Sequence, residues 1–186
     1  MPADPLRFLI IGAGPAGTAA ATNAAALGAK VTLAERSVVG GAAHLWDCIP
    51  SKTMTATAVR IDSMRNAPRL GLVAAPGSVD SAQLANRIST IAGDINRSWE
   101  SLLKSQAVEI VTGTARLVGP NEAVVDDGPR IPFDRCLLST GSEPRVPDWA
   151  PIDGQRILTT RDVYDLAAVP EKIIVIGSGV TGVEFV

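Results

Sequence analysis

A glycine-rich turn near the start of the chain has the spacing of a dinucleotide-binding motif. It follows a short apolar run over residues 7–11 and precedes an alanine-rich run. In such a turn the first glycine permits a sharp bend, the second lets the backbone approach a pyrophosphate, and the third allows a helix to pack closely on a strand. Free N–H groups at the helix N-terminus favour phosphates. The predicted binding residues of this turn are Gly12, Gly14, Pro15, Ala16 and Gly17.

An acidic residue supports this interpretation. Residues 31–35 form a second apolar run, and Glu35 ends it, where a carboxylate can accept hydrogen bonds from ribose hydroxyls. Arg36 follows directly and is assigned to the same site. A glycine turn without a ligand is the alternative, and the strand, the helix and Glu35 together argue against it.

A second turn of the same spacing lies near residue 180. Gly177, Gly179 and Gly182 follow an apolar run over residues 172–176, which is predicted to be a strand, and only the first residues of a helix come after them. Two such turns indicate two nucleotides, one held permanently and one arriving as a substrate. That is the layout of a two-cofactor oxidoreductase.

A segment between the turns makes the resemblance specific. Residues 40–52 read G-G-A-A-H-L-W-D-C-I-P-S-K, and residues 139–144 read S-T-G-S-E-P. With the two turns, these segments resemble the flavoprotein pyridine-nucleotide disulfide oxidoreductases, the group of lipoamide dehydrogenase, glutathione reductase and mercuric reductase, over nearly the whole chain. The resemblance implies that the first turn holds FAD and the second NADH or NADPH. It adds these residues to the cofactor site: Gly41, Ala42, Lys52, Thr140 and Gly141.

One departure from the family pattern matters for the chemistry. The family motif has two cysteines separated by four residues, whereas this sequence has Ala43 and then Cys48. The resemblance implies that the second thiol lies against the flavin and that the first exchanges with a disulfide substrate, so disulfide reduction by the family mechanism is not expected. Cys48 is the predicted catalytic thiol, with a thiol kept for packing as the alternative. Cys136 lies in an apolar run and is interpreted as a small hydrophobe.

The resemblance also implies a catalytic pair, Lys52 with Glu184. A cation near the flavin stabilises the anionic reduced ring, and a carboxylate fixes the lysine. A solvated lysine with an unrelated glutamate is the alternative. His44, the only histidine, is expected to be a polar group lining the cleft, because the family's acid/base histidine belongs to a C-terminal dimerisation domain outside this chain.

Hydrophobic periodicity predicts the elements that position these residues. Residues 7–35 form a strand, helix, strand unit, and residues 51–67 form a helix. A longer helix begins at Asp80 or Ser81, with one apolar face that consists of Leu84, Ile88, Ile91, Ile95, Trp99 and Leu102. This face is interpreted as packing on a neighbouring helix. Short runs at 108–111, 115–118, 122–125 and 136–138 fit a β-meander followed by a returning strand.

The predicted fold class is α/β, a Rossmann-like FAD/NAD(P)-binding domain with a β-meander and the truncated start of a second Rossmann-like domain. We place the FAD-binding domain at residues 1–150. The connector and the first strand, turn and helix of the NAD(P)-binding domain occupy residues 151–186.

Composition excludes several other classes. The 186 residues are 46% hydrophobic, and 17 basic against 19 acidic residues give a net charge of −2, which fits neither a disordered chain nor a nucleic-acid binder. Two cysteines and one histidine make neither a disulfide framework nor a metal site. No apolar run approaches the ~20 residues of a membrane span, and the N-terminus lacks the pattern of a signal peptide, so a cytoplasmic protein is expected.

These observations predict an FAD-dependent NAD(P)H oxidoreductase without a redox-active disulfide. Hydride is expected to pass from NAD(P)H to FAD and then to a diffusible acceptor, with a quinone as first choice, as in the single-cysteine quinone reductases that the chain resembles. A homodimer is expected for the full-length protein. The alternatives are a dihydrolipoyl dehydrogenase and, for this chain by itself, a non-catalytic FAD-binding module.

Overall fold

The structure is a computed structural model that describes residues 4–75 and 77–186. It divides into two compact units, which are considered separately. Unit 1 combines the residues up to His44 with Asp94–Glu143, and unit 2 combines Leu45–Gly93 with Pro144–Val186. The predicted domain boundary at residue 150 stays a prediction.

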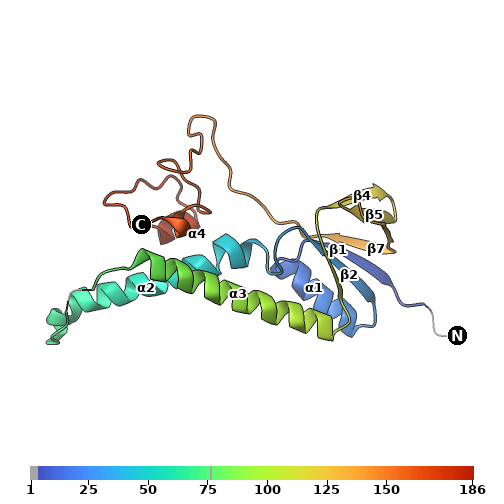
Figure 1. The fold of residues 1–186 in the computed structure, drawn as a ribbon, viewed down its shortest axis with the longest axis horizontal. Coiled ribbons are helices and arrows are strands. Elements are labelled where there is room, and N and C mark those ends of the chain that lie inside the picture. The colour runs from blue at the N-terminus through green and yellow to red at the C-terminus, as the bar shows by residue number, and fades with distance from the viewer. Residues whose placement is uncertain (1–3, 76) are drawn as a thin grey trace. The chain divides into compact units, whose positions relative to one another are not determined.

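A parallel four-stranded sheet forms the centre of unit 1 (Figure 1). Its strands occur in the order β3-β2-β1-β7. Helix α1 (Pro15–Ala26) connects β1 to β2 as the crossover that parallel neighbours require. The α/β fold predicted from the sequence is therefore confirmed. The strand bounds are Arg7–Ile11 for β1, Lys30–Glu35 for β2, Glu109–Thr112 for β3 and Arg135–Leu138 for β7.

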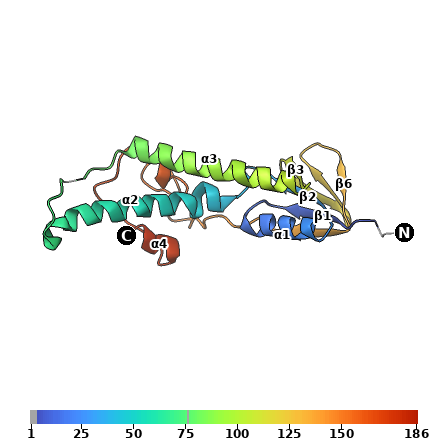
Figure 2. The same cartoon turned by 90° about the horizontal axis from the view of Figure 1, so that it is seen from below.

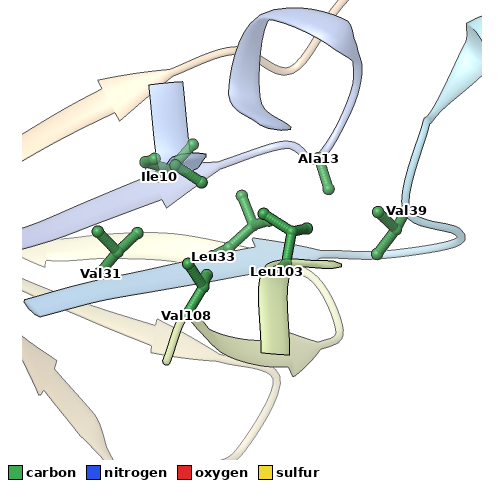
Figure 3. Close-up of a cluster of buried hydrophobic side chains, with 8 residues drawn as sticks. Ile10, Ala13, Val31, Leu33, Val39, Leu103 and Val108 are labelled. Carbon is green, nitrogen blue, oxygen red and sulfur yellow. The ribbon is translucent and has the colours of Figure 1, made fainter. Parts of the chain in front are cut away.

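Both faces of the parallel sheet are covered. Because strand side chains alternate between faces, Ile10 of β1 packs in one apolar cluster with residues of α1 and of the end of α3 (Ser81–Ser105). Figure 3 shows Leu103 and Val108 beside Leu33 in this cluster. The next residues of β1, Leu9 and Ile11, lie in a second cluster with Ala123 and Phe133. Burial on both faces explains why these strands read as continuous apolar runs.

The second cluster is closed by an antiparallel sheet of β4 (Ala115–Gly119), β5 (Glu122–Val125) and β6 (Arg130–Pro132). The predicted meander is thus present, but the set of strands assigned to it was partly wrong. The run at 108–111 is β3, which pairs with β2 in the parallel sheet because the long helix α3 serves as its crossover. The third meander strand is β6, which has only three residues and ends in a proline, so it gave no strand signal.

Unit 2 contains α2 (Ile49–Asn66), preceded by a π-helical turn η1 (Ala43–Asp47) and followed by a 3₁₀ turn η2 (Ala67–Leu70). The first half of α3 runs beside α2 (Figure 2), and Asp80 caps it, since its Oδ1 accepts the Gln83 N–H at 2.9 Å. The predicted cap is therefore confirmed. One position of the apolar face was wrong: Leu102 is 42% exposed, and Leu103 takes the buried position.

The remainder of unit 2 is mostly irregular. It contains a 3₁₀ turn η3 (Val163–Asp165) and a short helix α4 (Val180–Glu184). The strand predicted over residues 172–176 is not formed, and Ile174 is 89% exposed. The described residues supply no hydrogen-bonded neighbour for this segment, and a strand exists only as part of a ladder.

Candidate functional site

The first glycine turn joins β1 to α1 in the manner its spacing predicts. Gly12 has a φ of +102°, and a Cβ there would lie 2.3 Å from the Ser139 carbonyl oxygen. A Cβ at Gly17 would lie 1.9 Å from the Gly12 carbonyl oxygen. A Cβ at Gly14 would meet nothing within 4 Å. The outer glycines are therefore required by the fold, whereas the space at Gly14 is open to a ligand.

Ser139 holds this turn from the end of β7. Its backbone N–H donates to the Ile11 carbonyl at 2.8 Å, and its Oγ donates to the Gly12 carbonyl at 2.8 Å. Ser139 thus satisfies a carbonyl at the sharpest point of the turn. The sequence places Ser139 in the S-T-G-S-E-P segment without indicating a role for its side chain. Its place directly after a strand that ends at the same sheet edge was the available signal.

Glu35 binds the turn from the end of β2. One carboxylate oxygen accepts the Ala13 N–H at 2.7 Å, and the other accepts the Ser37 N–H at 2.8 Å. Ala13 is fully buried, so its N–H depends on this bond. Glu35 therefore shapes the backbone of the turn, in addition to the ribose contact expected from the sequence.

The segment after β2 lies against the same turn. The Gly40 N–H donates to the Ala13 carbonyl at 2.7 Å, and a Cβ at Gly41 would lie 3.1 Å from the Gly14 Cα. His44, which was expected to line the cleft, is instead buried, and its Nδ1 lies 2.5 Å from the Asn96 Oδ1. Gly40 has a φ of +111°, and a Cβ there would lie 1.8 Å from the His44 ring. His44 is thus a packing residue with a hydrogen-bonded partner.

A cavity of about 470 Å³ opens at the carboxyl edge of the parallel sheet. Arg36 and Glu143 form an ion pair at 2.9 Å between the segments that follow β2 and β7. Sequence reasoning missed Glu143, because two residues 107 positions apart give no local signal. Cavities at this edge are the usual ligand sites of parallel α/β sheets. The lining includes Gly12, Glu35, Arg36, Thr140, Gly141 and Glu143.

The second glycine turn repeats the local geometry of the first. Gly177 has a φ of +125°, and a Cβ at Gly182 would lie 2.1 Å from the Gly177 carbonyl oxygen. A Cβ at Gly179 would meet nothing within 4 Å. Gly14 and Gly179 precede their helices with nearly the same backbone angles, φ −67° with ψ −176° and φ −72° with ψ 176°.

The predicted catalytic pair is in contact within unit 2. Lys52 Nζ of α2 donates to the Glu184 carboxylate of α4 and lies 3.4 Å from the Ser51 Oγ. Ser51 is buried, and its hydroxyl donates to the Asp47 carbonyl at 2.7 Å. The contact between Lys52 and Glu184 that the family resemblance implied is confirmed, while their role in catalysis stays a proposal.

The two cysteines differ in their surroundings. Cys48 immediately precedes α2 as its N-cap residue, and its side chain is exposed. Pro50 lies in the first turn of this helix, as predicted. Cys136 lies on β7 beside the second apolar cluster, where burial raises the pKa of its thiol. Cys136 therefore has the surroundings of a packing residue, and both cysteines are free thiols.

Comparison with known proteins identifies the family. A model of the pyridine nucleotide-disulphide oxidoreductases matches residues 6–186. The chain belongs to this family. Its members are FAD-dependent oxidoreductases that use NAD(P)H, so the resemblance inferred from the sequence, with its cofactors, is confirmed.

The family members to which this chain is similar are named for two different activities. An NAD(P)H dehydrogenase (quinone) from Mycobacterium tuberculosis is 37% identical over 97% of this chain, and a dihydrolipoyl dehydrogenase from Bacillus subtilis is 32% identical over the same share. The chain spans 40% of the length of each relative.

Solved structures agree with this assignment. The crystal structure of LpdA from Mycobacterium tuberculosis has a TM-score of 0.86 at 37% identity, over 97% of this chain and 41% of that one. The flavoprotein disulfide reductase RclA from Escherichia coli has a TM-score of 0.79 at 23% identity, over 96% of this chain and 38% of that one, and shares the fold.

The first turn fits the FAD of this family. An open backbone at Gly14, a helix start without a side-chain cap, and a cavity with Glu35 in its lining are the features that a dinucleotide requires. Over the described residues there is no cluster of three or more potential metal ligands, and none of the described helices is long and apolar enough to cross a membrane.

Proposed function

We propose that this chain is part of an FAD-dependent NAD(P)H oxidoreductase that reduces a diffusible acceptor, a quinone, without a redox-active disulfide. The observation that carries the proposal is Ala43. It stands where the family motif has its first cysteine, and the two cysteines of this chain are both free. The similar quinone dehydrogenase from Mycobacterium tuberculosis supports the choice of acceptor.

The residues around the first turn bind and orient the flavin nucleotide. Gly14 and the uncapped start of α1 leave backbone N–H groups for the pyrophosphate. Glu35 accepts the ribose hydroxyls from its position at the cavity. The other residues assigned to this cofactor are Gly12, Pro15, Ala16, Gly17, Arg36, Gly41, Ala42, Lys52, Thr140 and Gly141.

The Lys52 and Glu184 pair supplies the electrostatics of hydride transfer. When bound, FAD supplies the hydride-accepting and electron-donating chemistry that the protein lacks. Lys52 holds a positive charge for the anionic reduced ring, and Glu184 fixes the position of its Nζ. The second turn, with Gly177, Gly179 and Gly182, binds the NADH or NADPH pyrophosphate.

Cys48 is the remaining thiol of the motif. We assign it a place beside the flavin, where an exposed thiol that precedes a helix can interact with the ring but has no partner for exchange. A homodimer and a cytoplasmic location are predictions for the full-length protein.

Steady-state assays of the full-length enzyme test the proposal. Duroquinone, lipoamide and oxygen are offered as acceptors with NADH or NADPH as donor. We expect turnover with duroquinone and none above background with lipoamide. Appreciable turnover of lipoamide or dihydrolipoamide would remove the argument from Ala43.

A second candidate function is that of a dihydrolipoyl dehydrogenase, which the similarity to the Bacillus subtilis enzyme favours. The variant Ala43→Cys separates the two functions. If loss of the first thiol is what prevents disulfide chemistry, this variant gains lipoamide turnover and Ala43→Ser does not. Appreciable lipoamide turnover by the wild type that Ala43→Cys does not raise supports the second candidate.

The chain by itself also admits a third role, that of an FAD-binding module without turnover, because it spans only 40% of the length of its relatives. Flavin spectra of the purified chain with and without NADH distinguish this role. Bleaching of the flavin by NADH supports an oxidoreductase, and an unchanged spectrum supports the module.

A further inference from the structure

An ion pair crosses the nucleotide cavity of unit 1. Arg36 directly follows β2, and Glu143 lies in the segment after β7. Strands β2 and β7 are the two neighbours of β1, so their ends lie two strand spacings apart, about 10 Å. The Arg36 Nη2 and the Glu143 Oε1 nevertheless meet at 2.9 Å. The pair therefore bridges the end of β1, where Ile11 and Gly12 line the cavity.

Arg36 is the sole cation among the described residues that line this cavity. The lining also has two carboxylates, Glu35 and Glu143. The Glu35 carboxylate already accepts the N–H groups of Ala13 and Ser37, and the pyrophosphate of a dinucleotide brings further negative charge. The position of the Arg36 guanidinium therefore affects how well the cavity holds an anionic ligand.

The backbones beside both charged residues are restrained, so the freedom that remains lies in the side chains. The Ser37 N–H, directly after Arg36, donates to the Glu35 carboxylate at 2.8 Å. Pro144 directly follows Glu143 and restricts its backbone to extended conformations. A free arginine side chain samples many rotamers and loses this freedom when a ligand confines it. The ion pair confines the arginine before the nucleotide binds.

We propose that Glu143 is a positioning residue for FAD, which holds the Arg36 guanidinium across the cavity so that the arginine retains the bound nucleotide. The inference rests on the assignment of this cavity to FAD, and it does not depend on which acceptor the enzyme reduces. The features that carry it are the course of the pair over the end of β1 and the sole cation of the lining.

The exposure of the pair determines the size of the expected effect. The two side chains are 65% and 62% exposed, and exposed ion pairs contribute little and are screened by salt. We therefore expect Glu143→Gln to release FAD about threefold faster than wild type. The same substitution also removes a negative charge near an anionic ligand, which by itself would slow release. The direction of the change thus separates positioning from repulsion.

The test measures the rate at which the oxidised full-length holoenzyme releases FAD after dilution, with free FAD separated by ultrafiltration. The proteins compared are wild type, Arg36→Gln, Glu143→Gln and the double variant. Because Glu143 acts through Arg36, adding Glu143→Gln to Arg36→Gln should not change the rate further. Glu122→Gln is the matched control, since it breaks an exposed pair with Arg130 that does not line this cavity, and it should release FAD like wild type.

Salt provides a readout that a merely structural role of Glu143 would not change. The Debye length falls from about 10 Å at 0.1 M salt to about 3 Å at 1 M. The ratio of the release rates of Glu143→Gln and wild type should therefore be about threefold at the lower concentration and approach one at the higher. A ratio caused by altered packing at Glu143 would persist at both concentrations.

Release from Glu143→Gln that is no faster than from wild type would overturn the inference. So would additive effects of Arg36→Gln and Glu143→Gln in the double variant, or a ratio of rates that salt does not change. Each of these results leaves the proposed function intact if the holoenzyme still reduces duroquinone. Conversely, salt-sensitive, non-additive effects on release in an enzyme that does not turn over duroquinone would support the inference and contradict the proposed function.

Discussion

The two glycine turns have the same local geometry in different surroundings. In both, the first glycine has a positive φ, and a Cβ on the third would collide with the carbonyl of the first, at 1.9 Å for Gly17 and 2.1 Å for Gly182. The first turn lies in a parallel sheet with a strand on each side of β1. The residues before the second form no strand. The turn is therefore specified by its own glycines, and the sheet is not needed to form it.

The surroundings decide what each turn can hold. Around the first, Glu35 and Ser139 come from neighbouring strands and bond the turn backbone, so its carbonyls and N–H groups are fixed before a ligand arrives. At the second turn, Glu184 of the following helix α4 forms an ion pair with Lys52. Preorganisation of the first turn supports the proposal that this turn holds the permanently bound nucleotide.

The largest effect is expected at the third glycines. Gly17→Ala should lower the free energy of unfolding of this chain by about 3 kcal/mol and abolish FAD retention, since the clash is with backbone fixed in a sheet. Gly182→Ala, in a turn free to relax, should change it by less than about 1 kcal/mol. Gly14→Ala is the control: it should unfold like wild type but retain less FAD. Chemical denaturation and flavin content check all three, and equal losses for Gly17→Ala and Gly182→Ala would refute the contrast.

The second largest effect is expected at the ion pair between Lys52 and Glu184, which follows the second turn. Lys52→Met should slow the bleaching of the flavin by NADH in the full-length enzyme about 100-fold, because a preorganised charge at the reacting ring is lost. Glu184→Gln should have a smaller effect of the same sign. Lys104→Met is the matched control, since Lys104 forms an ordinary helix pair with Glu100 at 3.2 Å. Stopped-flow absorbance gives the rates, and a normal rate for Lys52→Met would exclude the pair from catalysis.

A moderate effect is expected at the carboxylate of the first turn. Glu35→Ala should weaken FAD binding about tenfold or more, because it leaves the buried Ala13 N–H without an acceptor and removes the ribose contact. The FAD affinity of Glu35→Gln should lie between those of the wild type and Glu35→Ala. Glu122→Ala, which removes a surface pair with Arg130, is the control. Flavin released on dialysis measures the loss, and unchanged retention in Glu35→Ala would remove this residue from its assigned role.

The smallest effect concerns the anchor of β1. Arg7 bonds Asp134 at 2.6 Å, and this contact lowers the pKa of Asp134 to about 2. A lowered pKa gives stability that is present above the unfolded value, near 4, and is lost as the pH falls through about 2. The stability difference between wild type and Asp134→Asn should therefore be constant at neutral pH and shrink from pH 4 to pH 2. A difference that does not depend on pH would contradict this account.

Much of the fold could be predicted because its signals are local. Glycine spacing specified both turns, and apolar runs located β1 and β2. The pairing of Lys52 with Glu184, 132 residues apart, was available only from family resemblance. The turns and the strands, by contrast, depend on residue type and spacing, which can be recognised directly in the sequence.

The errors arose where tertiary context decides. Leu102 and Leu103 both continue a helical face from Trp99, and only packing against the sheet selects Leu103. The partner of β3 depends on the crossover that precedes it. The apolar run at 172–176 has strand composition, but strand formation requires a neighbour. The bonds from His44 to Asn96 and from Arg36 to Glu143 likewise join residues that the sequence does not connect.

The absence of a redox-active disulfide is the central claim and can be tested directly by an anaerobic dithionite titration of the full-length enzyme. With Ala43 in the motif, complete reduction should consume about two electrons per bound FAD, because the flavin is the only acceptor. A paired disulfide would raise the demand to about four electrons per FAD. An endpoint near two supports the account, and an endpoint near four would contradict it.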